Sequence, residues 1–159
     1  TPPVRSNRST WSSTDMEEKK VILYVRGEQY FEDVDPEATE LISEGVMTIS
    51  DGGVITLVYD ETELTGLEGT TTTFVIDGGM VTLTRSGELN SQMIFQMGKR
   101  HTSLYETPWG TLTVDVTTTG LSCRMDAHGG ILDIRYSIAV DHQVTGENRF
   151  KVRVREAAR

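Results

Sequence analysis

The segment RFKVRVREA, residues 149–157, alternates apolar and charged side chains from residue 149 to residue 155. Phe150, Val152 and Val154 are apolar, whereas each odd position between them and on either side is lysine or arginine. Because successive side chains of a β-strand point to opposite faces of its sheet, this pattern predicts a strand with one buried and one exposed face. Strands of this kind are typical of antiparallel sheets.

The same two-residue period recurs through KKVILYVRGEQYF, GVITLVYDE, MVTLTRSG and TLTVDV. Between such runs stand SDGGV, IDGGM and AHGGI, and the paired glycines favour the positive φ angles of tight hairpin turns. QMGKR resembles a fourth turn. Only the segments 12–18 and 34–42 leave room for a helix. We therefore expect about ten strands, near residues 19–31, 40–50, 53–62, 70–77, 80–87, 88–97, 99–107, 110–126, 130–140 and 148–156.

A meander of this length has to curl and close, or split into two sheets, to hide its edges. We expect an all-β protein with a closed or nearly closed antiparallel barrel of about 8–10 strands joined by hairpins. Residues 19–157 would form this single domain. Residues 1–18 would form an arm that is flexible or ordered by a partner, with Met16 either a native start or part of an ordinary terminus.

Composition limits where the protein works and what it binds. The chain of 159 residues has no long apolar run, and TPPVRSNRST lacks the apolar centre of a signal peptide. The single cysteine, Cys123, excludes an internal disulfide, and its parity with Leu121 and Met125 predicts a buried, inert thiol. We expect a cytoplasmic protein without membrane partners. A net charge of −9 repels phosphates, which makes nucleic acid an unlikely partner.

Four segments together resemble a known family. They are SEGV, LVYDETELTGLEGTTTTFVI, VTLTRSGELNSQMIFQMGKRHTSLYETPWG and IRYSIAV, which run in this order from about Glu40 to Val140. The chain resembles the YwiB-like family of small bacterial proteins, a domain of unknown function. The resemblance implies a lipocalin-like, calycin-type β-barrel, and it implies no activity. Residues 1–18 depart from the family pattern.

Two charged residues are predicted on inner faces of the barrel. Arg85 shares a strand face with Val81 and Leu83, and Glu61 follows Leu57 and Tyr59 on another. A buried charge is costly unless it is paired, so Glu61 and Arg85 would either bond each other as a polar cap of the barrel or hold a complementary group of a ligand.

Other side chains on inner faces complete a candidate ligand-binding set. Met93 and Phe95 suit an adaptable apolar lining, and three tyrosines would add hydroxyl groups. An ordinary packed core is the alternative for all of them. In YETPWG, residues 105–110, we expect a strand end and tight corner whose aromatic rings plug one end of the barrel. The candidate interior residues are Tyr59, Glu61, Arg85, Met93, Phe95, Tyr105 and Tyr136.

Catalytic and metal sites find little support in the sequence. His101, His128 and His142 are scattered without metal-ligand spacing, and no nucleophile elbow, P-loop or dinucleotide fingerprint occurs. We therefore predict no catalytic residue, no metal and no cofactor. The acidic segment 31–40 fits a solvated loop better than a calcium loop, and the segment 61–69 forms either a surface loop or a cover over the barrel mouth.

Three functions remain open. The first is a non-catalytic module that binds a small apolar or amphipathic ligand inside the barrel. The second is a structural or protein-interaction module with a filled core, acting through its surface or its N-terminal arm, for which a homodimer is one form. An enzyme ranks third, since its acid–base groups are few. The outward row Arg149, Lys151, Arg153 and Arg155 is either neutralised by neighbouring strands or open to an anionic partner.

Overall fold

The computed structural model describes residues 16–30, 35, 37–61, 68–87 and 90–157, and every regular element among them is a β-strand. This confirms the all-β prediction. The two segments that left room for a helix contribute residues 16–18 and 37–42 to strands instead. The strands are β1 (Met16–Tyr30), β2 (Glu37–Ser50), β3 (Ile55–Asp60), β4 (Thr70–Asp77), β5 (Met80–Gly87), β6 (Ser91–Gln96), β7 (Arg100–Thr107), β8 (Gly110–Asp126), β9 (Gly129–Val140) and β10 (Gln143–Glu156).

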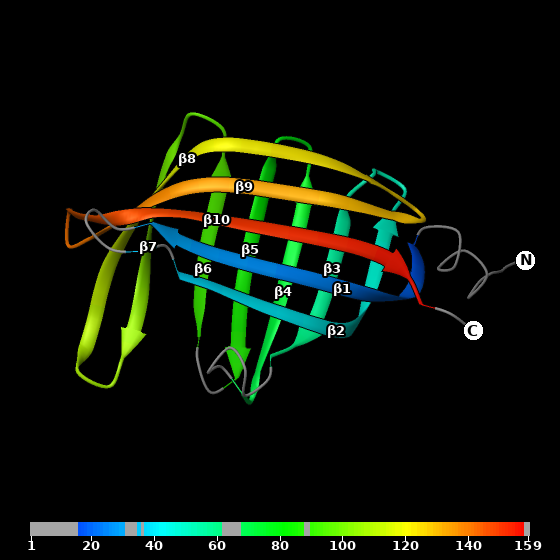
Figure 1. Cartoon of the computed structure of the whole chain (residues 1–159), viewed down its shortest axis with the longest axis horizontal. Helices are drawn as coiled ribbons and strands as arrows, with labels where there is room; N and C mark the ends of the chain where they lie inside the picture. Colours follow the sequence, from blue (N-terminus) through cyan, green and yellow to red (C-terminus); the bar gives the residue numbers. More distant parts are fainter. Residues whose placement is uncertain (1–15, 31–34, 36, 62–67, 88–89, 158–159) are drawn as a thin grey trace, which may run out of the picture.

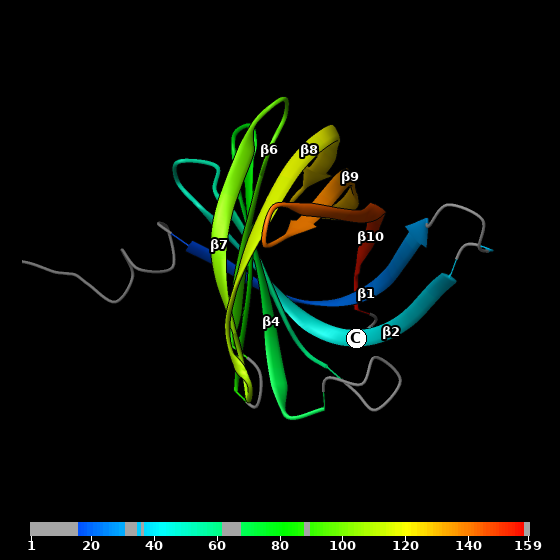
Figure 2. The ribbon, with the colours of Figure 1, turned by 90° about the vertical axis from the view of Figure 1, so that its left-hand side faces the viewer.

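The ten strands form one antiparallel sheet in the order β6-β5-β4-β3-β2-β1-β10-β9-β8-β7. The first and last strands of the chain pair with each other, which brings β1 and β10 side by side. The sheet curls on itself, so that β8, β9, β10, β1 and β2 form one wall and β3 to β6 form the facing wall (Figures 1 and 2). The prediction of a nearly closed antiparallel barrel is confirmed.

The two ends of the sheet, β6 and β7, meet around Thr118 of β8. The Thr118 N–H donates to the Lys99 carbonyl (3.2 Å), and its carbonyl accepts from the Gly98 N–H (3.0 Å). Its hydroxyl, buried in the barrel, accepts from the Gln96 N–H (3.1 Å). In the described strands the barrel is thus closed by a few hydrogen bonds around one residue, not by a full ladder between β6 and β7.

Hairpins join most consecutive strands, as the glycine pairs predicted. SDGGV connects β2 to β3, IDGGM connects β4 to β5, and AHGGI connects β8 to β9, each between strands that pair. QMGKR forms the turn before β7, although β6 and β7 do not pair along their lengths.

Most of the expected arm, residues 1–15, lies outside the described part, as do residues 31–34, 36 and 62–67 of the two predicted loops. β1 begins at Met16, three residues before the expected domain start.

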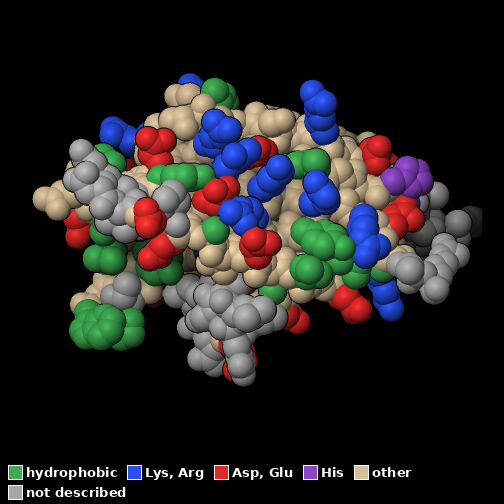
Figure 3. Space-filling model, in the orientation of Figure 1, with side chains coloured by type: hydrophobic (Ala, Val, Ile, Leu, Met, Phe, Trp, Pro, Cys, Tyr) green, Lys and Arg blue, Asp and Glu red, His purple; other side chains and the backbone are tan. Residues whose placement is uncertain are grey.

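Alternating burial follows the alternating sequence. In β3 and β4 every second side chain is buried, from Ile55 to Tyr59 and from Thr70 to Ile76. The outward row on β10 lies on the barrel exterior as predicted, where Lys and Arg side chains gather over β9 and β10 (Figure 3). The buried apolar side chains of all strands except β7 join in one core, whose burial supplies most of the stabilising free energy.

A row of five aromatic rings crosses this core. Tyr59 stacks beside Phe74 with ring centroids 6.4 Å apart, and Phe74 meets the edge of Phe150 at 6.1 Å. Phe150 stacks beside Tyr136 at 6.0 Å, and Tyr136 meets Phe95 at 4.8 Å. Such ring contacts contribute stabilising free energy beyond that of the area that the rings bury. The middle of the barrel is therefore filled, and any open space lies toward its ends.

The predicted plug at YETPWG is only partly present. Thr107 pairs with Gly110, which leaves Pro108 and Trp109 as the two turn residues of the β7–β8 hairpin. Tyr105 packs half-buried against the core, but Trp109 is 92% exposed. The expectation for Trp109 was wrong because this hairpin extends past the barrel end, so that its tip has no interior to fill (Figure 1).

Cys123 is exposed, which corrects the prediction of a buried thiol. It lies opposite Leu132 in the β8–β9 ladder and so occupies the inner face, as its parity indicated. Pairing of β8 with β7 ends at Thr117, however, and beyond it β8 has a paired strand only on its β9 side among the described strands. Strand parity gives the face of a residue but not whether another element covers that face.

Asp115 anchors the turn between β9 and β10 to β8. Its buried carboxylate accepts hydrogen bonds from the Thr102 hydroxyl (2.6 Å) and from Nδ1 of His142 (2.9 Å). Asp141 and His142, the two turn residues, have positive φ angles of 50° and 70° without being glycine. The hydrogen bond from Thr102, followed by that from His142, lowers the pKa of Asp115 below its ordinary value.

We expect Asp115→Asn to lower stability in a manner that depends on pH. A carboxylate whose pKa is lowered by folding stabilises the protein above its unfolded pKa, ordinarily about 3.8, and this contribution is lost as pH falls through the folded value. The gap in urea midpoint between wild type and variant should be full at pH 6 and narrow steadily below pH 4. Asp77→Asn, an exposed control at the end of β4, should follow the wild-type profile. A gap that stays constant down to pH 2 would contradict the assignment.

Candidate ligand cavity

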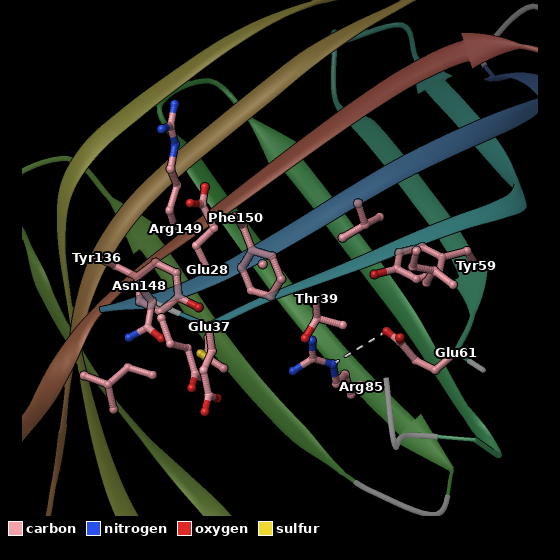
Figure 4. Close-up of a pocket in the computed structure, with 16 residues that line it drawn as sticks. Glu28, Glu37, Thr39, Tyr59, Glu61, Arg85, Tyr136, Asn148, Arg149 and Phe150 are labelled. Carbon is pink, nitrogen blue, oxygen red and sulfur yellow. Dashed lines mark ion pairs between the residues drawn. The ribbon is translucent and has the colours of Figure 1, made fainter. Parts of the chain in front are cut away.

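A cavity of about 390 Å³ opens at one end of the barrel. It lies where β1, β3, β5 and β9 end and where β2, β6 and β10 begin (Figure 4). This volume falls in the range of small-molecule sites in proteins. The residues that line it are Val25, Gly27, Glu28, Gln29, Glu37, Thr39, Leu41, Tyr59, Glu61, Arg85, Met93, Tyr136, Ile138, Asn148, Arg149 and Phe150.

The row of aromatic rings provides the inner end of the cavity. Tyr59, Tyr136 and Phe150 contribute from β3, β9 and β10, and each continues the inward face of its strand. Leu41 and Met93 add aliphatic surface from β2 and β6. The inner part of the cavity is therefore largely apolar, and it is bounded by side chains whose packing in the core holds them in place.

Glu61 and Arg85 meet in the cavity. Both flank Thr72 of β4, which pairs with Tyr59 on one side and with Arg85 on the other. The distance between Arg85 Nε and Glu61 Oε2 is 3.8 Å, and the two side chains are only 13% and 2% exposed. The Thr72 hydroxyl donates a hydrogen bond to Glu61. The predicted bond between the two charges is thus present as a buried ion pair.

The Arg85 guanidinium has an N–H donor that forms no hydrogen bond among the described residues. Its Nε is buried and has no hydrogen-bond acceptor among the described residues, since 3.8 Å to Glu61 exceeds hydrogen-bond length. Its Cζ lies 5.9 Å from the centre of the Phe150 ring, at the range of a cation–π contact. A guanidinium carries five N–H donors in one plane. Arg85 therefore presents a fixed planar donor group to the cavity.

The two tyrosines of the cavity remain protonated. Burial raises the pKa of Tyr59 far above its ordinary value, and the nearby Glu61 carboxylate raises it further. Burial likewise raises the pKa of Tyr136. Both phenols are consequently neutral at physiological pH.

Carboxylates mark the rim of the cavity. Glu28 accepts a hydrogen bond from the Tyr30 hydroxyl (2.5 Å) and lies 3.6 Å from Arg26, and the hydrogen bond lowers the pKa of Glu28. Glu37, at the first position of β2, is exposed. Thr39 and Asn148 add neutral polar groups near Arg85 and Tyr136 (Figure 4). Arg149, which also lines the cavity, is paired with Asp133, so the rim carries mainly negative charge around the deeper Glu61–Arg85 pair.

Of the seven predicted interior residues, five line the cavity: Tyr59, Glu61, Arg85, Met93 and Tyr136. Phe95 is fully buried behind the ring of Tyr136, and Tyr105 packs against the core without lining the cavity. Sequence reasoning missed Asn148, although it shares its parity with Phe150. It also missed Thr39, because no strand was predicted before residue 40, and Leu41, which lies in the predicted strand 40–50 but was not included among the interior residues.

The histidines lie apart from the cavity. His101 approaches the Gln96 side chain (3.1 Å), His128 contacts Glu156 (2.7 Å), and His142 contacts Asp115. In the described part of the chain, no cluster of three or more His, Cys, Asp or Glu side chains could hold a metal ion. No helix in this part is long and apolar enough to cross a membrane.

Comparison with known proteins gives the family. The model of a domain of unknown function, DUF1934, matches residues 23–152. The chain belongs to the DUF1934 family. No curated protein matches the sequence. The crystal structure of the ywiB protein from Bacillus subtilis is similar over 93% of this chain and 99% of that chain, with a TM-score of 0.78 and 19% identity.

These matches confirm the resemblance to the YwiB-like family that the sequence motifs indicated. At 19% identity the structural likeness establishes the fold of this DUF1934 domain. The fold by itself assigns no activity, because one fold hosts many functions.

Proposed function

We propose that this DUF1934 domain binds a small amphipathic molecule with an anionic end in the cavity at the barrel end. The observation that carries the proposal is the Arg85 guanidinium, which is 13% exposed and lies beside Glu61 in a cavity whose inner end is formed by aromatic and aliphatic side chains. A carboxylate matches the planar donors of a guanidinium. The apolar body of the ligand would lie against Met93, Leu41 and Phe150.

The rim narrows the class of ligand. Glu28 and Glu37 lie at the opening, and Glu61 lies 3.8 Å from Arg85, so a ligand with several negative charges would meet repulsion. A single anionic group that contacts Arg85 from the side opposite Glu61 avoids most of this cost. We therefore favour a monoanion, such as a medium-chain carboxylate, over a polyphosphate.

Octanoate and 1-octanol, which differ only in the anionic end, test this proposal by NMR titration of the 17.7 kDa protein. We expect octanoate to shift the methyl resonances of Leu41, Met93 and Ile138 and to bind at least tenfold more tightly than octanol. Arg85→Met should weaken octanoate binding by about 10- to 100-fold, because a hydrogen bond to a charged group contributes about 1.5–3 kcal/mol. Octanol binding should stay the same.

Arg100→Met, which removes an exposed arginine outside the cavity, is the matched control and should leave octanoate binding unchanged. Octanoate binding that survives Arg85→Met, or cavity resonances that respond to neither compound, would contradict the proposal.

The second hypothesis, a filled barrel that acts through its surface, is favoured by the aromatic row across the core. Native mass spectrometry of freshly purified protein separates the two hypotheses. A small molecule that co-purifies with the wild type but not with Arg85→Met supports the ligand-binding hypothesis. Protein that carries no such molecule and does not bind octanoate supports the hypothesis of a filled barrel.

A further inference from the structure

Lysine and arginine side chains gather on the outer face of the wall formed by β8, β9, β10 and β1 (Figure 3). Antiparallel residues that pair share a face, and Arg155, Arg153 and Lys151 of β10 pair with Ile22, Tyr24 and Arg26 of β1. On the other side of β10, Arg153 and Lys151 pair with Ile131 and Asp133 of β9. Arg124 of β8 pairs with Ile131, Arg135 of β9 pairs with Arg149, and Lys20 shares the face of Ile22 in β1. We call this group the basic face; it consists of Lys20, Arg124, Arg135, Lys151, Arg153 and Arg155.

Few carboxylates lie among the charges of the basic face; Asp133, which pairs with Lys151 across β9 and β10, is an acidic residue within it. Arg149, at the end of the β10 row, is paired with Asp133 by two hydrogen bonds of 2.9 and 2.6 Å. Arg26 is paired with Glu40 and Glu28. None of the six residues of the basic face forms an ion pair within the described part of the chain. The predicted neutralisation of the row thus holds for Arg149 and in part for Lys151, whose neighbour on β9 is Asp133, whereas Arg153 and Arg155 have no such carboxylate opposite them on β9 or β1.

Apolar side chains lie among these cations. Tyr24 stands beside Arg155, whose Cζ is 5.8 Å from the ring centre and whose Nε donates to the hydroxyl (3.3 Å). Ile42 of β2 is 66% exposed and pairs with Tyr24, and Ile131 of β9 is 37% exposed. An aromatic ring and flat guanidinium groups are the surfaces on which unpaired bases stack.

We propose that the basic face binds single-stranded nucleic acid, a function separate from the cavity. Alternate residues of β10 place Lys151, Arg153 and Arg155 about 6.6–6.8 Å apart in a row, which suits a polymer with regularly repeated charge. Tyr24 and its apolar neighbours would contact bases that a single strand exposes. A convex sheet has no helix or ribbon to enter the groove of a duplex.

The net charge of −9 does not prevent this binding. At physiological ionic strength charges are screened over about 8 Å, so a phosphate on the basic face responds mainly to the cations beside it. The proposal departs from the expectation that net charge makes nucleic acid unlikely, because the basic face concentrates cations on one wall of the barrel.

Fluorescence anisotropy with labelled 20-nucleotide oligothymidylate and oligouridylate tests the proposal on the full chain. If about four phosphates are neutralised, affinity should fall about 50-fold between 50 and 200 mM salt. Arg153→Gln with Arg155→Gln should weaken binding at least tenfold. Lys99→Gln with Arg100→Gln removes two other exposed charges and should change affinity less than threefold. Tyr24→Leu should weaken binding about fivefold or more.

The double variant Lys20→Gln with Arg124→Gln leaves β10 unchanged and tests the same face if the β10 variant fails to fold. It should also weaken oligonucleotide binding several-fold. Absence of binding at 50 mM salt, or equal losses in the β10 and Lys99/Arg100 variants, overturns the proposal. The proposal is also overturned if the protein binds polyglutamate, or vesicles of phosphatidylserine and phosphatidylcholine, and oligothymidylate does not displace it from them.

Discussion

Gly130→Ala is expected to lower the free energy of unfolding by roughly 2–6 kcal/mol, the sum of backbone strain and overpacking. A Cβ at this position would lie 1.9 Å from the Arg124 carbonyl oxygen and 2.7 Å from the Met125 Cα. Both atoms belong to the backbone of β8, which cannot retreat without opening the β8–β9 ladder. The φ angle of Gly130, 151°, is also one that other residues rarely adopt. Urea denaturation followed by far-UV circular dichroism measures the loss.

Gly79→Ala is the matched control for this substitution. Gly79 lies in the β4–β5 turn, where a Cβ would meet no atom within 4 Å, and its φ is outside the glycine-favouring range. Stability should stay the same or rise by about 0.4–1 kcal/mol, since alanine restricts the unfolded chain. Equal urea midpoints for the two variants would show that β8 and β9 do not approach as closely as described.

Breaking the Glu61–Arg85 pair on one side should cost about 3 kcal/mol, near the lower end for buried pairs because the two atoms are 3.8 Å apart. Arg85→Met leaves a carboxylate that is only 2% exposed without its counter-charge. Glu61→Leu leaves the Arg85 guanidinium, which is 13% exposed, without its counter-charge. The double variant replaces both charges by apolar groups and should unfold near the wild-type midpoint, because such replacements are often neutral or stabilising.

Urea midpoints of the wild type, the two single variants and the double variant form a complete double-mutant cycle. A coupling free energy of about 2 kcal/mol or more is expected. If Arg85→Met instead raised stability and left octanoate binding unchanged, neither the ion pair nor the ligand role of Arg85 would stand. The double variant should be stable yet bind octanoate poorly, which separates the structural role of the pair from its role toward a ligand.

The strands themselves were largely predictable from local pattern. Alternation in RFKVRVREA gave the face of each residue in β10, and the glycine pairs located the turns before β3, β5 and β9. The start of β10 was missed because its turn uses Asp141 and His142 at positive φ, where no glycine marks the site. The start of β2 was missed because Pro36 and acidic residues obscure the alternation before residue 40.

The candidate site was predictable in part for the same reason. Parity placed Glu61 and Arg85 inside, and the hairpin order of β3, β4 and β5 brings them to either side of Thr72. Parity could not tell an interior residue that lines a cavity, such as Met93, from one that is sealed in the core, such as Phe95. It could not predict that Cys123 is exposed either, because the sequence of β8 does not show how far β7 extends along it.

The sequence by itself determined the all-β class, the strand faces, the turns and the two inward charges, because each depends on residues that are neighbours in the chain. Only the tertiary structure decided that Thr39 and Asn148 share a cavity with Arg85, and that cations of four strands form one basic face. These groupings depend on how far the sheet curls and on which strands lie side by side after β1 pairs with β10. Such pairings join segments more than a hundred residues apart, and no local pattern records them.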